Sequence, residues 1–359
     1  MKIVVGMSGG VDSAVSALLL HRAGHEVIGV FMKNWEEADG DGVCTATQDW
    51  QDVQATCDVI GIPYYAVNFT KEYRDRVFSH FLSEYQQGRT PNPDVLCNRE
   101  IKFKAFLEFA LKLGAEKLAT GHFANLREEA DGVRLLRGAD ANKDQSYFLY
   151  MLTQQPLSRA MFPVGSLTKQ AVRHMAREAG LPIADKRDST GVCFIGERDF
   201  KKFLQGFLPA QPGKIVTPDG TVVGCHDGLM YYTLGQRRGL GIGGTSGSAG
   251  RWFVVEKDLE RNCLVVLQGD DSPLLYSTTC EADGATWTLS QPPAASFDCT
   301  AKYRYRQADQ RVHVEVSGQG LLITAYEPQR AVTPGQSVVL YDGDVCLGGG
   351  VVKTVVDTQ

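Results

Sequence analysis

A short polar loop near the amino terminus contains the residue types needed to bind phosphate. It follows the apolar run 2–6, precedes a helix-like run and reads Met7-Ser8-Gly9-Gly10-Val11-Asp12-Ser13. Free backbone N–H groups attract anions where a strand runs into a helix. Gly9 and Gly10 let the backbone approach phosphate closely, and the hydroxyls of Ser8 and Ser13 can donate hydrogen bonds. Asp12 would repel phosphate unless Mg²⁺ lay between them, so the loop predicts a phosphate site that includes a metal ion.

Comparison with known motifs narrows the type of loop. It has neither the lysine of the G-x-x-x-x-G-K-[ST] motif nor the spacing of the G-x-G-x-x-G dinucleotide motif. The sequence S-G-G-x-D-S resembles the pyrophosphate loop (PP-loop) of the ATP pyrophosphatase superfamily, whose members cleave ATP to AMP and pyrophosphate and adenylate a substrate oxygen. The alternative is a glycine-rich turn that binds nothing. Adenylation makes AMP a leaving group, so the sequence should also contain a nucleophile.

Cys97 is the first candidate for that nucleophile. It lies in the polar segment Gly88-Arg89-Thr90-Pro91-Asn92-Pro93-Asp94-Val95-Leu96-Cys97-Asn98-Arg99-Glu100-Ile101-Lys102-Phe103-Lys104. We expect a proline-restrained loop that delivers Cys97 to the start of a helix. The helix end, together with Arg99, Lys102 and Lys104, would lower the pKa of the thiol. Asp94 is better suited to act as a general acid/base or as a hydrogen-bond partner of the substrate.

Cys193 is the second candidate, in the charged, glycine-containing segment 186–198, KRDSTGVCFIGER. Two such cysteines could meet across a cleft. Free cysteines are usually small buried side chains, and we expect this of Cys44, Cys57, Cys225, Cys263, Cys280, Cys299 and Cys346. The nine cysteines include no C-x-x-C pair and no zinc-type spacing, which indicates a reduced compartment.

The composition is that of a globular protein of two or three domains, with 359 residues of which 43% are hydrophobic and 22% charged. No apolar run approaches the ~20 residues that span a bilayer, so we expect a cytoplasmic protein with no membrane partner. The net charge of −5 is unusual for a nucleic-acid enzyme. However, residues 1–60 carry three Lys and Arg against nine Asp and Glu, and the rest carries 34 against 33. The acidity is therefore local, and residues 165–205, with eight basic against five acidic residues, form a weak basic patch.

The order of apolar runs predicts the fold. Strand-like and helix-like runs alternate over about the first 200 residues, as in a parallel sheet covered by helices on both faces. We predict strands at 2–6, 26–32, 63–68 and 117–120, and helices at 13–23, 47–60, 73–86, 101–112 and 169–179. From about Pro209, short β-rich runs alternate with turns.

We therefore predict three domains. The first is an α/β domain at residues 1–208, with a parallel sheet and a PP-loop, similar to the adenine nucleotide alpha hydrolases. A central β-rich domain at 209–286 and a C-terminal β-barrel domain at 287–359 would follow it. Ligands bind such parallel sheets outside the carboxyl ends of the strands, which is where the phosphate loop lies.

Several long motifs together identify a family. They are SGGVDS, GRTPNPDVLCN, ATGHFA, KDQSYFLY, KRDSTGVCFIGER, GLMYYTLGQRRGLGIGG, RYRQ and AVTPGQSVVLYDGDVCLGGG. In this order, over nearly the whole chain, they resemble the bacterial tRNA-specific 2-thiouridylases. The resemblance implies an ATP-dependent tRNA-uridine 2-sulfurtransferase that adenylates the 2-carbonyl of the wobble uridine, at position 34 of the tRNA, and replaces the oxygen with sulfur. It also implies AMP and pyrophosphate as products, ATP and Mg²⁺ as cofactors, and a sulfur-relay protein as donor.

The resemblance also implies roles for single residues. Cys193 would carry a persulfide received from the donor, Cys97 would be the nucleophile and form a transient disulfide with Cys193, and Asp94 would be the acid/base. The implied ATP site comprises Gly6, Met7, Ser8, Gly9, Gly10, Val11, Asp12, Ser13, Met32 and Gly121.

The implied tRNA contacts are scattered along the chain: Asn92, Pro93, Asp94, His122, Lys143, Asp144, Gln145, Arg304, Tyr305 and Gln336. Arg and Lys can hold phosphate, and Tyr or His can stack on an exposed base. Simpler alternatives exist: His122 could be a hydrogen-bonded residue at a strand end, and Arg304 and Tyr305 could lie on a solvated strand face. We expect the chain to act as a monomer.

Other interpretations remain open. An amide-forming ligase of the PP-loop superfamily would use ammonia, but the chain shows no glutaminase region and both cysteines would lack a role. A nucleotide-sensing RNA-binding module would bind ATP without turnover. A labile iron–sulfur cluster on Asp94, Cys97 and Cys193 would be a variant of the thiolation chemistry, although cluster proteins usually carry a C-x-x-C pair.

Overall fold

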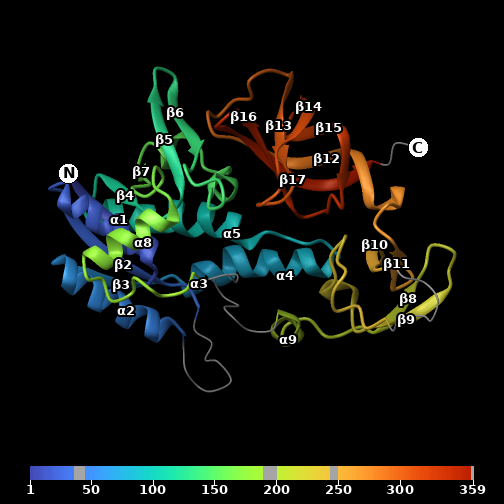
Figure 1. Cartoon of the computed structure of the whole chain (residues 1–359). Helices are drawn as coiled ribbons and strands as arrows, with labels where there is room; N and C mark the ends of the chain where they lie inside the picture. The colour runs from blue at the N-terminus through green and yellow to red at the C-terminus, as the bar shows by residue number, and fades with distance from the viewer. Residues whose placement is uncertain (36–44, 189–199, 243–249, 357–359) are drawn as a thin grey trace.

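The amino-terminal part of the chain is an α/β domain built on a parallel sheet (Figure 1). The computed structural model describes residues 1–35, 45–188, 200–242 and 250–356. The strand order is β3-β2-β1-β4-β7, and every pair of neighbours is parallel. The strands are β1 (Lys2–Met7), β2 (Glu26–Lys33), β3 (Tyr64–Asn68), β4 (Lys117–Ala119) and β7 (Ala160–Met161).

Helices cover both faces of this sheet, because the side chains of β1 alternate between two cores. Ile3 and Val5 belong to one core and Val4 to the other. The first core also receives α1 (Val11–Arg22), α2 (Thr45–Ile60) and α8 (Lys169–Glu178). The second receives two long helices, at 70–86 and 93–112, and the short helices α7 (Gln154–Leu157) and α9 (Phe200–Gln205). The predicted α/β domain is confirmed.

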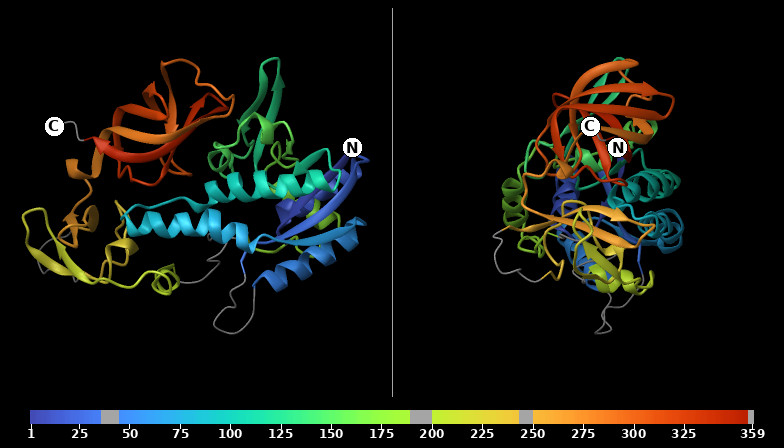
Figure 2. Two further views of the ribbon diagram at one scale, coloured as in Figure 1. Left: turned by 180° about the vertical axis from the view of Figure 1, so that it is seen from behind. Right: turned by 90° about the vertical axis from the view of Figure 1, so that its right-hand side faces the viewer.

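The two long helices run side by side across the molecule (Figure 2). The first consists of α3 (Thr70–Tyr73), a π-helical stretch at Arg74–Phe78 and α4 (Ser79–Gln86). The second consists of α5 (Pro93–Leu96), a π-helical stretch at Cys97–Phe106 and α6 (Leu107–Lys112). The predicted start of the second helix, at Ile101, was wrong by about two turns. Pro93 occupies the first turn of the helix, where backbone N–H groups have no partner within the helix. The N–H that proline lacks therefore costs the helix no hydrogen bond.

Two smaller β structures follow. The central sheet has the order β10-β11-β8-β9, with β8 (Gly213–Val216), β9 (Val222–His226), β10 (Trp252–Asp258) and β11 (Cys263–Gln268). The last domain is a barrel of β12 (Tyr276–Trp287), β13 (Ser296–Lys302), β14 (Gln310–Ser317), β15 (Gly320–Arg330), β16 (Ser337–Asp342) and β17 (Val345–Val356). β12 pairs with both β15 and β17, which closes the barrel. The prediction of β-rich domains ending in a β-barrel is confirmed.

A hairpin of the α/β domain extends the sheet of the barrel, which the sequence did not predict. It comprises β5 (Ala124–Glu129) and β6 (Gly132–Arg137), and β6 pairs with β17 through Leu135 and Leu136. Arg137 reinforces the contact, since its guanidinium lies 3.7 Å from the centroid of the Tyr341 ring. The first and last domains are therefore joined by backbone pairing as well as by side chains.

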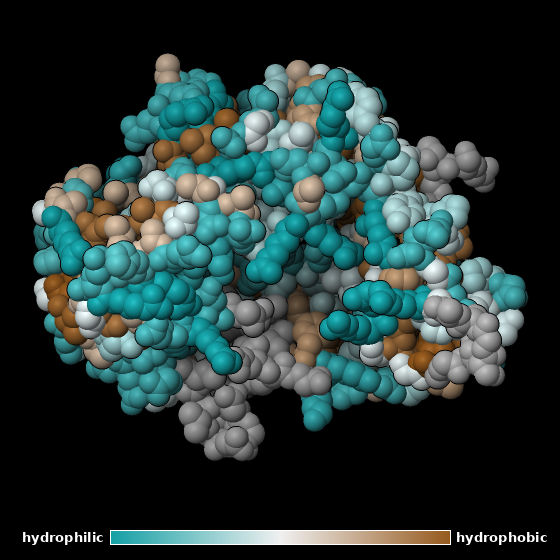
Figure 3. Space-filling model, in the orientation of Figure 1, coloured by the Kyte–Doolittle hydropathy of each residue, from teal (hydrophilic) through white to brown (hydrophobic). Residues whose placement is uncertain are grey.

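Hydrophilic side chains predominate on the face of the molecule shown in Figure 3. Among the described residues, no helix is both long enough and apolar enough to cross a membrane.

Candidate active site

The phosphate loop lies where β1 ends and α1 begins, as the sequence predicts. Gly9 has a φ of +74°, and a Cβ atom there would lie 2.8 Å from the carbonyl oxygen of Asp49. Both the backbone angle and the close approach require glycine. The Oγ atoms of Ser8 and Ser13 lie 3.2 Å apart, and Ser13 Oγ accepts the N–H of Ser8 at 3.2 Å. The two serines therefore fix the shape of the loop.

The other residues predicted to lie near the nucleotide also lie at this loop. Gly121 follows β4, and a Cβ atom there would lie 2.6 Å from the backbone nitrogen of Ser13. A Cβ atom at Gly6 would lie 3.7 Å from Cε of Met32, on β2. The structure thus brings the predicted ATP residues together at the carboxyl ends of three parallel strands, where ligands bind in such sheets.

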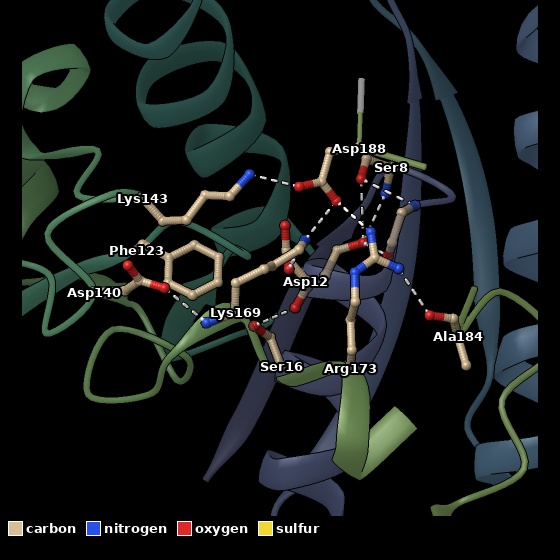
Figure 4. Close-up of polar contacts among 12 residues, drawn as sticks. Ser8, Asp12, Ser16, Phe123, Asp140, Lys143, Lys169, Arg173, Ala184 and Asp188 are labelled. Atoms are coloured by element: carbon tan, nitrogen blue, oxygen red, sulfur yellow. Dashed lines mark hydrogen bonds and ion pairs between the residues drawn. The ribbon is translucent and has the colours of Figure 1, made fainter. Parts of the chain in front are cut away.

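Three basic side chains converge on two carboxylates beside the loop (Figure 4). Lys169 Nζ lies 2.6 Å from Oδ1 of Asp12 and 2.8 Å from Oδ1 of Asp188. Arg173 Nη2 lies 2.7 Å from the same oxygen of Asp188, and Lys143 Nζ lies 2.5 Å from the other. We call these five residues the cation cluster. It joins the first turn of α1, the first two turns of α8 and the segments around residues 143 and 188.

The two carboxyl groups of the cation cluster titrate differently. Burial raises the pKa of Asp12, and the hydrogen bond from Lys169 opposes this. Burial also raises the pKa of Asp188, but hydrogen bonds from Lys143 and Lys169 outweigh it and hold the pKa at about 2. Asp188 is therefore an anion at neutral pH, and it offsets part of the positive charge around it.

Lys186 supports the loop from its other side. Its Nζ donates to the carbonyl oxygen of Gly9 at 3.1 Å and to carboxylate oxygens of Asp49 and Asp52 at 2.7 and 2.6 Å. Part of the acidic amino-terminal stretch thus serves to hold one lysine. Lys186 was not among the predicted site residues, and the signal for it in the sequence was the basic patch at residues 165–205.

Lys169, Arg173 and Asp188 were also missed from the sequence, and Lys143 was assigned to tRNA. Lys169 is the first residue of α8, where an N-terminal cation is unexpected because it opposes the helix dipole. This position of Lys169 was the signal in the sequence that could have revealed the cluster, since a lysine at a helix start needs a compensating anion.

Cys97 is buried, with 1% of its surface exposed, in the fifth position of the helix that begins at Pro93. The prediction that it lies at the start of a helix was wrong, because the helix starts earlier. Glu100 pairs with Arg99 Nε and Lys104 Nζ, both at 2.9 Å, and offsets two of the three positive charges that were expected to act on the thiol. Asp94 lies half-buried in the first turn of the same helix.

The helix that carries Cys97 also packs against the strand that leads to the phosphate loop. A Cβ atom at Gly6 would lie 3.0 Å from Cε1 of Phe106. Phe106 and Cys97 are separated by roughly 14 Å along a helix, so one helix sets the spacing between thiol and loop. Cys193 lies outside the described residues, and its meeting with Cys97 stays a prediction.

His122 is the residue after Gly121, and its side chain is buried. Its Nδ1 lies 2.7 Å from Oγ1 of Thr120, and its ring packs against Phe103 and Phe162. Burial, with a contribution from Lys102, lowers the pKa of His122 well below its usual value, so the ring is neutral at pH 7. The structure thus supplies the simpler role, that of a hydrogen-bonded residue at a strand end.

Asp144 and Gln145 bond to the backbone of their own domain. Asp144 Oδ1 accepts the N–H groups of Gly138 and Ser146 at 3.0 and 3.1 Å. Gln145 Oε1 accepts the N–H of Phe123 at 3.0 Å. These bonds position the segment that carries Lys143.

The remaining residues assigned to tRNA lie where domains meet. Arg304 Nη2 donates to the carbonyl oxygens of Leu234 and Ala331, both at 3.1 Å. The ring centroid of Tyr305 lies 4.4 Å from that of Phe148, in the α/β domain.

Gln336 bonds to the segment that precedes Asn92. Gln336 Nε2 donates to the carbonyl oxygen of Thr90 at 2.6 Å, and Thr90 donates its N–H to the carbonyl oxygen of Pro334 at 3.0 Å. The barrel therefore holds the segment that leads to Asn92, Pro93 and Asp94.

The other cysteines follow the expected pattern only in part. Cys57, Cys280 and Cys346 are buried, and burial raises the pKa of the first two to about 12. Cys263 and Cys299 are half-buried. Cys225 is exposed, so the prediction was wrong for that residue, which lies on β9 of the small central sheet. Cys44 lies outside the described residues.

Three family models match successive parts of the chain. The model of the tRNA methyl transferase HUP domain matches residues 1–197, that of the tRNA methyl transferase PRC-barrel domain matches 201–268, and that of the aminomethyltransferase beta-barrel domain matches 277–352. The three matches follow the same order as the three sheets.

Full-length relatives share most of the sequence and one name, tRNA-specific 2-thiouridylase. The protein of Lysinibacillus sphaericus is 60% identical over 99% of this chain and 95% of its own length. That of Bacillus subtilis is 59% identical over 99% and 95%. That of Lactococcus lactis subsp. cremoris is 58% identical over 100% and 96%. Identity at this level across all three domains shows that the chain belongs to the family of the tRNA-specific 2-thiouridylases.

Proposed function

We propose that this enzyme uses ATP to activate the 2-carbonyl of the wobble uridine, at position 34 of a tRNA, and replaces the oxygen with sulfur, giving 2-thiouridine, AMP and pyrophosphate. One structural observation supports the proposal most directly. A PP-loop at the ends of the parallel strands and the helix bearing Asp94 and Cys97 are held in one α/β domain. Such a domain can hold ATP and a thiol at a set separation, which the two half-reactions require.

The phosphate loop would bind the triphosphate of ATP through its backbone N–H groups and the hydroxyls of Ser8 and Ser13. Mg²⁺ is commonly held by one or two carboxylates together with substrate phosphates. Asp12 supplies one such carboxylate in the first turn of α1, and among the described residues no group of three His, Cys, Asp or Glu side chains could form a metal cage. The site thus fits a Mg²⁺ ion that arrives with ATP and neutralises phosphate charge there.

The sulfur chemistry would involve Asp94, Cys97 and Cys193. The 2-oxygen of uridine attacks the α-phosphorus of ATP and expels pyrophosphate. The terminal sulfur of a persulfide on Cys193 then attacks C2, and the C2–O bond breaks with loss of AMP. Cys97 attacks Sγ of Cys193, which breaks the sulfur–sulfur bond, leaves the sulfur on C2 and forms a Cys97–Cys193 disulfide. A cellular thiol reductant must then supply two electrons to reduce that disulfide, and Asp94 would transfer protons at the base.

The structure divides the proposed tRNA contacts into two groups. Gln336 of the barrel bonds to Thr90, Tyr305 packs against Phe148 of the α/β domain, and Arg304 bonds to Leu234, between β9 and β10. Asn92, Pro93, Asp94, His122, Lys143, Asp144 and Gln145 lie in the α/β domain. We propose that the first group contacts the tRNA backbone and fixes its approach, while the second lies closer to the target base.

The remaining partners follow from the chemistry. A protein that carries persulfide sulfur would deliver it to Cys193, and the enzyme would act as a cytoplasmic monomer. Reduced thiols and a tRNA substrate both agree with that compartment.

Nucleoside analysis of tRNA tests this function. Purified tRNA lacking the modification is incubated with enzyme, ATP, Mg²⁺ and a sulfide source, then digested to nucleosides. We expect 2-thiouridine only when ATP is present, with one AMP per modified uridine. Consumption of ATP without any 2-thiouridine would refute the proposal. Persulfide transfer is tested separately with Cys193→Ser, which should make no 2-thiouridine from relay-delivered sulfur.

A further inference from the structure

The cation cluster lies directly beside the phosphate loop, yet none of its basic residues belongs to the loop motif. We infer that Lys169 and Arg173, together with Lys143 from the proposed tRNA-contact segment, bind the polyphosphate chain of ATP, and that Asp188 accepts hydrogen bonds from all three until ATP displaces it. The inference rests on the proposed use of ATP. It adds to the ATP site three basic side chains that bind phosphate and one carboxylate, Asp188, that competes with phosphate for them.

Lys169 is the central member of the cation cluster. It is buried, and its Nζ bridges Asp12 and Asp188 at 2.6 and 2.8 Å. Because Asp12 lies in the first turn of α1, Lys169 is held beside the free N–H groups of the phosphate loop. Loop and lysine would act on the same anion. The arrangement supplies from α8 the cation that other phosphate loops carry within their own sequence.

Arg173 and Lys143 reach the same place from different elements. Arg173 lies one turn after Lys169 on α8, and its Nη1 is fixed by the carbonyl oxygen of Ala184 at 2.9 Å. Lys143 comes from the segment that Asp144 and Gln145 position. Three cations face two carboxylates, so the cluster keeps a net positive charge that favours a polyanion.

Among the residues that the structure describes, Asp188 is the one group that contacts all three cations. It accepts from Lys169 and Arg173 with one oxygen and from Lys143 with the other. A phosphate group offers three oxygens and more charge to the same donors, so it can replace the carboxylate without leaving a buried cation unpaired.

Two other cations near the cation cluster, Lys186 and Arg177, have contacts that are fully explained by a structural role. The ammonium of Lys186 has three donors, and Gly9, Asp49 and Asp52 accept all of them. Arg177, on the next turn of α8, pairs with Asp185 at 2.8 Å on the exposed surface. The Arg177–Asp185 pair therefore provides matched controls from the same helix and the same downstream segment.

Calorimetric titration of the full chain tests the inference, with Mg·ATP and with inorganic pyrophosphate as the two probes. We expect Lys169→Gln and Arg173→Gln each to weaken binding of both probes about tenfold or more, as loss of a charge-assisted hydrogen bond does. Asp188→Asn should strengthen binding about threefold or more, because the competing charge is gone. Arg177→Gln and Asp185→Asn should bind as the wild type does.

The sign of the Asp188→Asn effect decides between two roles. If Asp188 only held the three cations in position, its neutralisation would weaken binding, and that result would overturn the inference. Unchanged binding in Lys169→Gln would overturn it as well. Lys169→Arg guards against a folding defect, since it should recover part of the affinity that Lys169→Gln loses.

The same titrations separate this inference from the proposed function. A wild-type chain that makes 2-thiouridine, together with variants whose affinities do not change as stated, rejects the inference alone. A wild-type chain that binds neither ATP nor pyrophosphate rejects both.

Discussion

The phosphate site and the thiol site of this enzyme are built in different ways. The phosphate loop and the cation cluster lie within the α/β domain, and their contacts run between residues of that domain. The segment at 88–90, which leads to the helix with Asp94 and Cys97, is held from outside. Lys257 Nζ, from the central sheet, donates to the carbonyl oxygen of Gly88 at 2.9 Å, and Gln336 of the barrel donates to that of Thr90 at 2.6 Å.

This difference separates the two substrates. The phosphate site has a shape that depends on one domain, whereas the segment that leads to Cys97 is also held by the two domains that follow. Because the barrel also carries proposed tRNA contacts, tRNA binding can act on the helix start through Thr90 while the phosphate site is unaffected. The comparison therefore predicts that variants will fall into two classes, those that change ATP binding and those that change sulfur transfer.

The largest effect should come from Cys97→Ser. Removing the thiol should lower 2-thiouridine formation on the order of 10³-fold or more, as loss of a nucleophile does. ATP affinity should stay unchanged, since the phosphate loop is untouched. Nucleoside analysis and ATP titration measure the two quantities. Cys225→Ser, at an exposed position, is the matched control and should keep full activity.

A somewhat smaller effect, confined to ATP, is expected for Gly121→Ala. The new Cβ atom would lie 2.6 Å from the backbone nitrogen of Ser13, so the phosphate loop must move. We expect the KM for ATP to rise about 10- to 100-fold, because a misplacement of 1 Å at a reacting centre costs about that much. The affinity for tRNA should not change. Gly224→Ala is the control, since its Cβ would lie 3.6 Å from the nearest atom.

Substitutions of Lys257 and Gln336, which hold the segment 88–90 from the other two domains, should slow thiolation and leave the KM for ATP unchanged. Lys257→Met and Gln336→Ala each remove one hydrogen bond to the segment 88–90, and each should lower the kcat of thiolation about tenfold. The KM for ATP should stay at its wild-type value in both variants. Lys353→Met, which alters an exposed pair with Asp283, serves as control. A rise in the KM for ATP would contradict the separation of the two sites.

The smallest expected effect is on the free energy of unfolding, which should depend on pH through His122. Burial lowers the pKa of His122 well below the 6.5 of an exposed histidine. The unfolded chain therefore binds a proton below pH 6.5 that the folded chain does not bind. Stability from this residue is complete above pH 6.5 and falls by about 1.4 kcal/mol per pH unit below it. Denaturation of the wild type and of His122→Gln between pH 7.5 and 5 should show a shallower slope for the variant.

Much of the α/β domain could be predicted from the sequence. Its strands are short apolar runs and its helices are amphipathic, so the predicted bounds of β1, β2 and α8 agree with the structure to within one residue. The start of the helix at Pro93 was missed because the polar run N-P-D-V-L-C-N resembles a loop. The hairpin of β5 and β6 was missed because its partner strand, β17, is about 200 residues away in the sequence.

By itself, the sequence determined the family, and it predicted a PP-loop for ATP, an acid/base and candidate sulfur carriers. The PP-loop can be recognised because its residues are close along the chain, where local backbone geometry relates them, whereas Cys97 and Cys193 are far apart in the sequence. The tertiary structure alone decided which cations surround the phosphate loop and which domains hold the helix with Cys97. Lys143, Lys169, Arg173 and Asp188 become neighbours only when α8 packs beside α1, and Lys257 and Gln336 reach the segment at 88–90 only when all three domains are assembled. Such contacts depend on long-range packing, which no spacing within a motif encodes.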